Sequence, residues 1–163
     1  MAEPVNSDQE IWSRLVEAHV AIAKAAAAFL GPGVDRVSLI RRALHNQDRT
    51  TALYILPWLK EPELTSLFED LLWLASFSHG GVEVARRAIS SLPREWVLSR
   101  IEADAESLLR DGDYDQYWRL LELYILLDRG LTLRLASRAA AHPDRDISEA
   151  GEDFLNKLSA TPC

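Results

Sequence analysis

Four predicted helices in this sequence begin at nearly equal intervals, and this spacing restricts the fold more than any other feature. They begin at Arg49, Val82, Tyr114 and Ile147, which lie 33, 32 and 33 residues apart. Each follows a short polar turn and an earlier helical segment, so this part of the chain divides into four helical hairpins. A fixed period of this length is typical of stacked helical units. The sequence therefore predicts an array in which each hairpin packs on the next.

The hairpins are predicted from apolar periodicity and turn residues. Their paired segments are 34–46 with 48–60, 62–78 with 81–92, 93–110 with 113–128, and 131–142 with the segment ending at 158. In the last hairpin, Pro143 ends the first helix, Asp146 can cap the second, and Glu149 completes a capping box. The apolar residues of that second helix share one face, namely Ile147, Ala150, Phe154, Leu155 and Leu158.

A row of small residues is predicted at the helix contacts. Three residues into the second helices stand Ala52, Ala85, Tyr117 and Ala150. Three of these four are alanine, which allows close approach of neighbouring helices. We expect the row to be buried.

Composition agrees with a single helical domain spanning 1–163. Apolar residues make up 48% of the chain and charged residues 26%, the balance of a globular protein. Glycine and proline, seven of each, gather at the expected turns. No apolar stretch is long enough to cross a membrane, and the opening MAEPVNSDQE is too polar for a signal peptide, so we expect a cytoplasmic protein.

An additional helix is expected before the array, over residues 7–30. Ser7 and Glu10 form a capping box, and Ile11, Leu15 and Ile22 continue an apolar face. The Gly-Pro-Gly at 31–33 ends the helix. Its alanine-rich second half suits close packing, so we expect it to pack on a neighbour or to cap one end of the array.

The turns between paired helices resemble those of HEAT repeats. LHNQDRTTAL, FSHGGVEVAR, LRDGDYDQYW and AHPDRDISEA each have a short polar turn, often with aspartate, then an apolar residue and an alanine three later. The short period is most similar to the bacterial HEAT-like subgroup, and the resemblance covers 34–158. Two positions depart from the pattern: Arg49 replaces an apolar residue and Tyr117 a small one. Tetratricopeptide repeats have a similar period, but their Trp, Leu-Gly and Tyr pattern is missing.

This resemblance implies a right-handed α-solenoid of four HEAT-like hairpins plus the N-terminal helix. In HEAT proteins the second helices line the concave face. By the same resemblance, we expect that face on the helices beginning near residues 49, 82, 114 and 147.

Charged and aromatic residues form two rows on the exposed side of the second helices. Five residues after each start stand Tyr54, Arg87, Arg119 and Glu152, and one residue after each start stand Thr50, Glu83, Asp115 and Ser148. Trp58 lies beside Tyr54, and the acids stand four residues before the arginines. Arginine flanked by aromatic residues is typical of a binding surface. The candidate partner-binding residues are Tyr54, Trp58, Glu83, Arg87, Asp115 and Arg119.

A simpler interpretation remains open for the same charges. Acid and arginine four residues apart stabilise their own helix by about 0.3 to 0.5 kcal/mol per pair. The Glu83–Arg87 and Asp115–Arg119 spacings are therefore explained equally well without any partner.

The remaining tryptophans are assigned to packing. Trp12, Trp73 and Trp96 lie beside apolar faces and are expected to be buried in contacts, whereas Trp58 is expected to be exposed. Trp118 sits at the edge of the core face. Arg86 occupies the same edge position, so it must extend outwards or find a carboxylate.

No catalytic or metal-binding motif is found. His45, His79 and His142 each end a first helix, where imidazole can bond terminal carbonyls, and no HExxH or cysteine pair occurs. The single cysteine, Cys163, is terminal. We therefore expect no metal, no cofactor and no enzymatic activity.

The favoured function is a non-catalytic module that binds a protein or peptide on the concave surface. A net charge of −7 disfavours nucleic acid and leaves a second possibility, an immunity-type inhibitor of a basic toxin. A third comes from the resemblance, since HEAT-like folds include DNA glycosylases that use tryptophan and a catalytic aspartate, for which Asp115 would be the candidate. The oligomeric state is left open.

Overall fold

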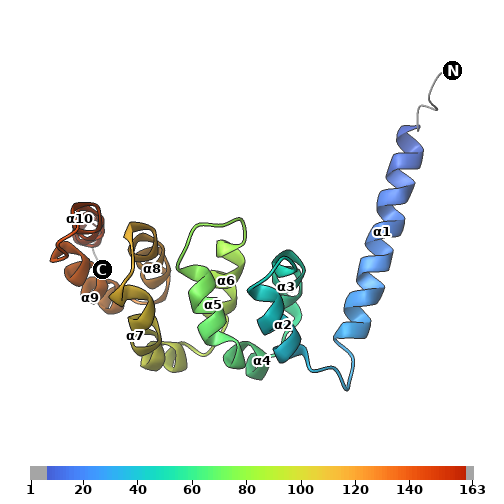
Figure 1. The fold of residues 1–163 in the computed structure, drawn as a ribbon, viewed down its shortest axis with the longest axis horizontal. Coiled ribbons are helices and arrows are strands. Elements are labelled where there is room, and N and C mark those ends of the chain that lie inside the picture. Colours follow the sequence, from blue (N-terminus) through green and yellow to red (C-terminus); the bar gives the residue numbers. More distant parts are fainter. Residues whose placement is uncertain (1–6, 161–163) are drawn as a thin grey trace.

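The computed structural model describes residues 7–160, and over these residues it contains helices and no strand (Figure 1). The expected all-α class is therefore confirmed. Cys163 and the first six residues of the opening segment lie outside the described residues.

The helices follow the predicted hairpins. In chain order they are α1 (Asp8–Phe29), α2 (Arg36–Leu44), α3 (Arg49–Ile55), the 3-10 helix η1 (Leu56–Trp58), α4 (Glu61–Ser66), α5 (Phe68–Ala75), α6 (Val82–Ser90), α7 (Arg94–Arg110), α8 (Tyr114–Leu127), α9 (Arg129–Ala140) and α10 (Arg145–Ala160). The predicted starts at Arg49, Val82 and Tyr114 agree with the structure, whereas α10 begins two residues before Ile147. The single helix expected over 62–78 is two, because the backbone bends at the buried Leu67.

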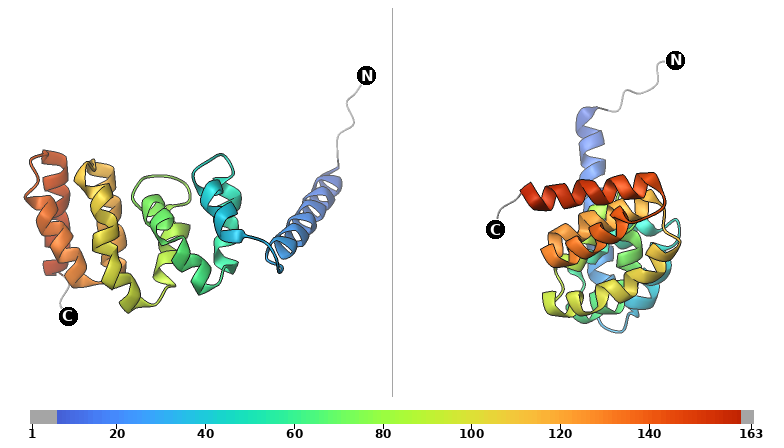
Figure 2. Two further views of the ribbon diagram at one scale, coloured as in Figure 1. Left: turned by 60° about the horizontal axis from the view of Figure 1, so that its bottom comes forward. Right: turned by 90° about the vertical axis from the view of Figure 1, so that its left-hand side faces the viewer.

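The helices lie in pairs along a row, with α1 at one end (Figures 1 and 2). α2 packs on α3, α5 on α6, α7 on α8 and α9 on α10. Successive pairs also touch, since α5 contacts α2 and α7, and α8 contacts α6, α9 and α10. The apolar side chains between these layers form one continuous core.

The row of small residues is buried as expected. Ala52, Ala85, Tyr117 and Ala150 are each no more than 3% exposed. Tyr117 fits in place of a small residue because its hydroxyl donates to the carbonyl oxygen of Leu109 at 3.2 Å. A buried tyrosine usually needs such a partner.

Arg49, the other departure from the repeat pattern, connects the first pair of helices to the second. Its guanidinium lies 5.4 Å from the ring centre of Trp73 and 5.7 Å from that of Phe77, both from the second pair. Its Nε donates to the carbonyl oxygen of Leu44 at 2.7 Å, which satisfies one of the free carbonyls at the end of α2. Arg49 therefore occupies the position of the expected apolar residue by placing its guanidinium against two aromatic rings.

Ion pairs join α7 to α9, the first helices of the third and fourth pairs. Arg134 binds Glu102 through two hydrogen bonds of 2.8 and 2.9 Å, and Arg138 binds Glu106 through two of 2.6 and 3.2 Å. Both pairs span 32 residues, which is close to the spacing of the predicted helix starts. They tie α9 to α7 on the exposed side of the row.

α1 forms where predicted, but only its C-terminal end touches the array. Its capping box is present, with Ser7 Oγ accepting from the Glu10 amide and the Glu10 carboxylate accepting from the Ser7 amide. None of its residues is buried, and Phe29 and Ala26 are the residues of α1 that pack partly on the core. The turn at Gly33, with φ of +81°, leads the chain from α1 into α2, and α1 extends away from the row (Figure 1).

The tryptophans divide according to this arrangement. Trp73, Trp96 and Trp118 are half-buried against the core, and Trp58 is 50% exposed, as expected. The expectation that Trp12 is packed is wrong, because Trp12 is 60% exposed on the part of α1 that extends beyond the array.

Gly151 allows α10 to approach α9 closely. A Cβ atom at this position would lie 2.7 Å from the carbonyl oxygen of Ala136 and 2.8 Å from the carbonyl carbon of Ala139. These are backbone atoms, so they cannot move aside without separating the helices.

We expect Gly151→Ala to lower the free energy of unfolding by about 1 to 3 kcal/mol, the usual cost of overpacking. Urea titration followed by circular dichroism would measure the change. Gly80→Ala is the control, because a Cβ there meets nothing within 4 Å. Equal stability of Gly151→Ala and the wild type would contradict the close contact.

Candidate functional site

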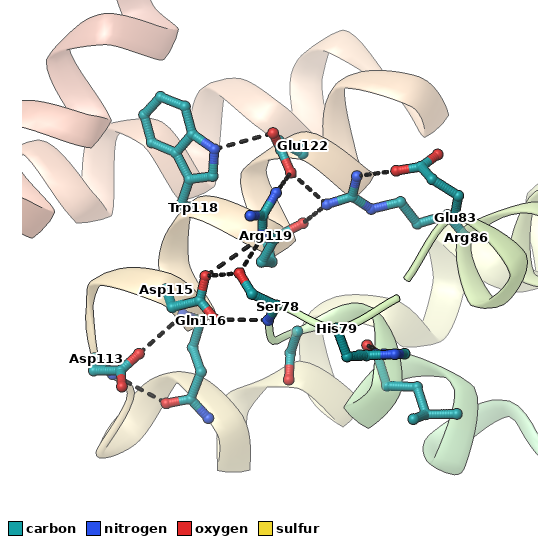
Figure 3. Close-up of polar contacts among 12 residues, drawn as sticks. Ser78, His79, Glu83, Arg86, Asp113, Asp115, Gln116, Trp118, Arg119 and Glu122 are labelled. Atoms are coloured by element: carbon teal, nitrogen blue, oxygen red, sulfur yellow. Dashed lines mark hydrogen bonds and ion pairs between the residues drawn. The ribbon is translucent and has the colours of Figure 1, made fainter. Parts of the chain in front are cut away.

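Polar side chains from three segments meet between the second and third pairs of helices (Figure 3). They come from the loop between α5 and α6, from α6, and from α8. We call this group the polar network, and its members are Ser78, Glu83, Arg86, Asp115, Trp118, Arg119 and Glu122. Three of the six predicted site residues belong to it: Glu83, Asp115 and Arg119.

Arg86 lies at the centre of the polar network with only 7% of its side chain exposed. Its Nη2 donates to Glu122 at 2.5 Å and to the carbonyl oxygen of Arg119 at 3.1 Å, and its Nη1 donates to Glu83 at 2.7 Å. Its Nε is buried and has no hydrogen-bond partner among the described residues. The expectation that Arg86 extends outwards or finds a carboxylate is met by two carboxylates.

Arg119 joins the other half of the polar network. Its Nη1 donates to Glu122 at 2.8 Å, and its Nε donates to Ser78 Oγ at 2.9 Å and lies 3.4 Å from Asp115. The predicted ion pair between Asp115 and Arg119 is therefore present. It is one contact of a larger set that reaches another pair of helices.

The predicted pairing of Glu83 with Arg87 is different in the structure. The Glu83 carboxylate pairs with Arg86, and Arg87 donates only to the backbone carbonyl of Glu83, at 3.3 Å. The physical reason is burial. A guanidinium removed from water needs counter-charges, whereas the exposed Arg87 remains solvated.

The beginning of α8 positions Asp115. Asp113 caps the helix by accepting from the Gln116 amide at 3.0 Å, and Gln116 accepts in return from the Asp113 amide. Asp115 in this first turn accepts from the amide of Ser78 at 2.7 Å and from its hydroxyl at 2.5 Å. These bonds attach the loop between α5 and α6 to the third pair of helices.

The network keeps its carboxylates ionised. Burial opposes ionisation of Asp115, but the hydrogen bonds from Ser78 and the charge of Arg119 outweigh it, so its pKa lies below the usual value. For Glu122, burial is again outweighed, here by Arg86, Arg119 and Trp118, and its pKa is also lowered. Both groups are therefore negatively charged at neutral pH.

The other three predicted residues lie outside the polar network. Tyr54 and Trp58 are 42% and 50% exposed, and their rings meet edge to face with centres 4.8 Å apart. Arg87 is exposed and lines a groove of about 480 Å³ between η1, α4 and α6, together with Leu56 and Pro57. The 3-10 helix η1, which carries Trp58, thus forms part of one wall of the groove, and α6, which carries Arg87, forms the other.

The hydroxyl group of the polar network belongs to Ser78 and lies between two charged partners. Ser78 Oγ donates to Asp115 and accepts from Arg119. The neighbouring His79 is occupied by the Leu74 carbonyl and the Gly81 amide. Among residues 7–160, no group of three histidine, cysteine or acidic side chains could hold a metal ion, and no helix is long and apolar enough to cross a membrane.

Sequence reasoning did not assign Ser78 or Glu122. The position of Glu122 in the sequence could have predicted its contacts, because it stands three residues after Arg119 and 36 residues after Arg86, an arginine expected to need a carboxylate. No feature of the sequence predicts the contact of Ser78 with Asp115, since that contact depends on how the loop bends.

The chain matches no protein-family model, no curated protein and no solved structure. Its function therefore has to be inferred from the side chains and their arrangement.

We expect Glu122→Gln to lower the free energy of unfolding by about 1 to 3 kcal/mol, because it removes one of the two counter-charges of the buried Arg86. Denaturant titration would measure the loss. Glu152→Gln removes an equivalent charge at an exposed position of α10 and should change stability by less than about 0.5 kcal/mol. Similar effects of both substitutions would mean that the polar network adds no stability.

Stability should also fall in acid. In the folded protein the pKa values of Asp115 and Glu122 lie below their ordinary values of 3.8 and 4.5. Ionisation of these two carboxylates therefore stabilises the fold above the ordinary pKa values. This stabilisation is lost as the pH falls through the lower pKa values of the folded state. Unfolding measured from about pH 6 down to about pH 3 should show the stability difference between wild type and Glu122→Gln shrinking. A difference that stays constant would exclude ionised Glu122 as its cause.

Proposed function

We propose that the chain is a non-catalytic interaction module: a right-handed α-solenoid of four short HEAT-like repeats over 34–158, preceded by a helix, that binds a protein or peptide on its second helices. The row of helix pairs supports this, as do ion pairs that recur one repeat apart. Repeats of this kind present extended surfaces to partners.

The single observation that carries the proposal is the exposed contact between Tyr54 and Trp58. Exposing the large apolar rings of tryptophan and tyrosine to water is energetically unfavourable. These two residue types are also enriched among the residues that contribute most of the binding energy at interfaces. Here the two rings support each other at the end of α3 and η1 instead of turning into the core. A partner would cover apolar area that is already ordered.

Arg87 extends this surface to the next repeat. It borders the groove whose other wall includes Leu56, Pro57 and Glu61. A bound segment would therefore meet apolar side chains and one carboxylate on one side and a positive charge on the other. A peptide with an apolar residue followed by a carboxylate fits this chemistry, since arginine binds carboxylates with directed hydrogen bonds.

Glu83, Asp115 and Arg119 have a different role in this proposal. Their side chains are engaged in the polar network. Asp115 and Arg119 hold the α5–α6 loop against α8, and Glu83 pairs with Arg86, which joins α6 to α8. They therefore keep the helix of Arg87 in position without being the contacts themselves.

We expect Trp58→Ala combined with Arg87→Ala to weaken partner binding by at least about 30-fold, equivalent to about 2 kcal/mol. Affinity capture from the host lysate with the wild-type chain would identify the partner, and titration calorimetry would measure the loss. Tyr114→Ala is the matched control, because Tyr114 is an aromatic residue of similar exposure on α8.

The alternatives give different results in the same experiments. A basic toxin as partner would bind with an association rate that falls steeply with salt, which would favour the inhibitor function. Binding to duplex DNA at low salt would favour the glycosylase function, although three carboxylates and two arginines make the network around Asp115 unfavourable for phosphate. Capture of the same proteins by the wild type and the double variant would refute the proposed surface.

A further inference from the structure

α1 is an amphipathic helix whose apolar side chains face water. None of its 22 residues is buried. The large apolar residues that it exposes by 45% or more are Ile11, Trp12, Leu15, Val16, Val20 and Ile22. A helix in water owes most of its stability to packing of its apolar face, so α1 lacks a stabilising surface over most of its length.

The apolar face of α1 has the spacing of a coiled coil. Its members alternate in steps of four and three residues, the heptad pattern, and they are Ile11, Leu15, Ala18, Ile22, Ala25 and Phe29. We call this stripe the α1 seam. Large and small residues alternate through its middle, from Leu15 to Ala25, so each large residue needs a small one opposite it.

The second half of the α1 seam lines an apolar groove. Ile22, Ala25 and Phe29 form one wall of a cavity of about 560 Å³. Residues of α2 and α3 form the other, including Leu39, Ile40, Ala43, Ala52 and Ile55. The groove thus lies where α1 leaves the array, and the first half of the seam extends beyond it (Figure 1).

We propose that two copies of this chain form an antiparallel dimer in which the first half of α1 from each copy occupies this groove of the other. One register matches the α1 seam throughout its middle: Leu15 of one copy lies opposite Ala25 of the other, and Ala18 opposite Ile22. A two-fold axis repeats both matches, so the surface is complementary to itself.

Charge complementarity selects a second copy as the occupant. The first half of α1 carries Asp8, Glu10 and Glu17 against a single arginine, Arg14, and is therefore acidic. Lys24 of α1 and the exposed Arg42 of α2 directly precede the groove residues Ala25 and Ala43 in the sequence. Asp48 is the charged residue that lines the groove itself, and it can pair with Arg14.

The antiparallel direction follows from the same charges and from the room that the two helical arrays need. It brings the acidic half of each α1 beside the half of the other that carries Lys24, whereas parallel helices would place like charges together. It also puts the two arrays at opposite ends of the helix pair. Both copies then cover apolar residues that the isolated chain leaves in water.

Sedimentation equilibrium of the full chain tests the dimer. We expect twice the mass of one chain for the wild type and a single mass for Leu15→Glu, which places a charge in the α1 seam. Ser13→Glu adds the same charge to the same helix outside the seam and should stay dimeric, because Ser13 is two residues from Leu15 and faces another side. A monomeric wild type, or a dimeric Leu15→Glu, would overturn the proposal.

Disulfide trapping tests the direction, in a Cys163→Ser background. Residues 15 and 25 of one helix are about 15 Å apart, too far for a bridge within the chain. Leu15→Cys combined with Ala25→Cys should therefore give a covalent dimer on oxidation, and Leu15→Cys alone should not. Cross-linking of the single variant would show parallel helices, and failure of the double variant to cross-link would refute the register. Neither readout requires the partner proposed for the second helices.

Discussion

Close approach of helices, through short side chains in the second helix of each pair, is the constraint on which the rest of the structure depends. Ala52, Ala85 and Ala150 remove bulk where larger residues would hold neighbouring helices apart. Tyr117 is tolerated because its hydroxyl has a carbonyl partner in the core. Once this row is buried, helix geometry decides which residues of the same helices reach solvent.

The polar network shows how this helix packing brings charged residues of different helices together. Residues of α6 and α8 that are about one repeat apart come together, so a carboxylate of one helix can neutralise an arginine of another. Arg86 is buried because Glu83 and Glu122 accompany it. The charged residues that the sequence predicted to bind a partner therefore fall into two groups. Some of them hold neighbouring helix pairs together, and others face water.

Two of the surfaces on which the described residues expose apolar area carry the proposals. One is the ring contact of Tyr54 and Trp58, on the array itself, and the other is the α1 seam together with its groove. The first combines aromatic rings with a nearby arginine, which suits a different protein. The second is proposed to bind the first half of α1 from another copy. Tyr54 lines this groove and also contacts Trp58, so the two surfaces adjoin and share one residue.

The sequence by itself determined the elements. Capping residues such as Ser7 and Asp113, the prolines and the 3.6-residue periodicity act over a few neighbours, so helix starts at Arg49, Val82 and Tyr114 could be predicted. Only the tertiary structure decided the contacts between helix pairs. The partners of Arg86 and Ser78, and the exposure of Trp12, depend on how helices and loops are placed in space, and no local spacing encodes that placement.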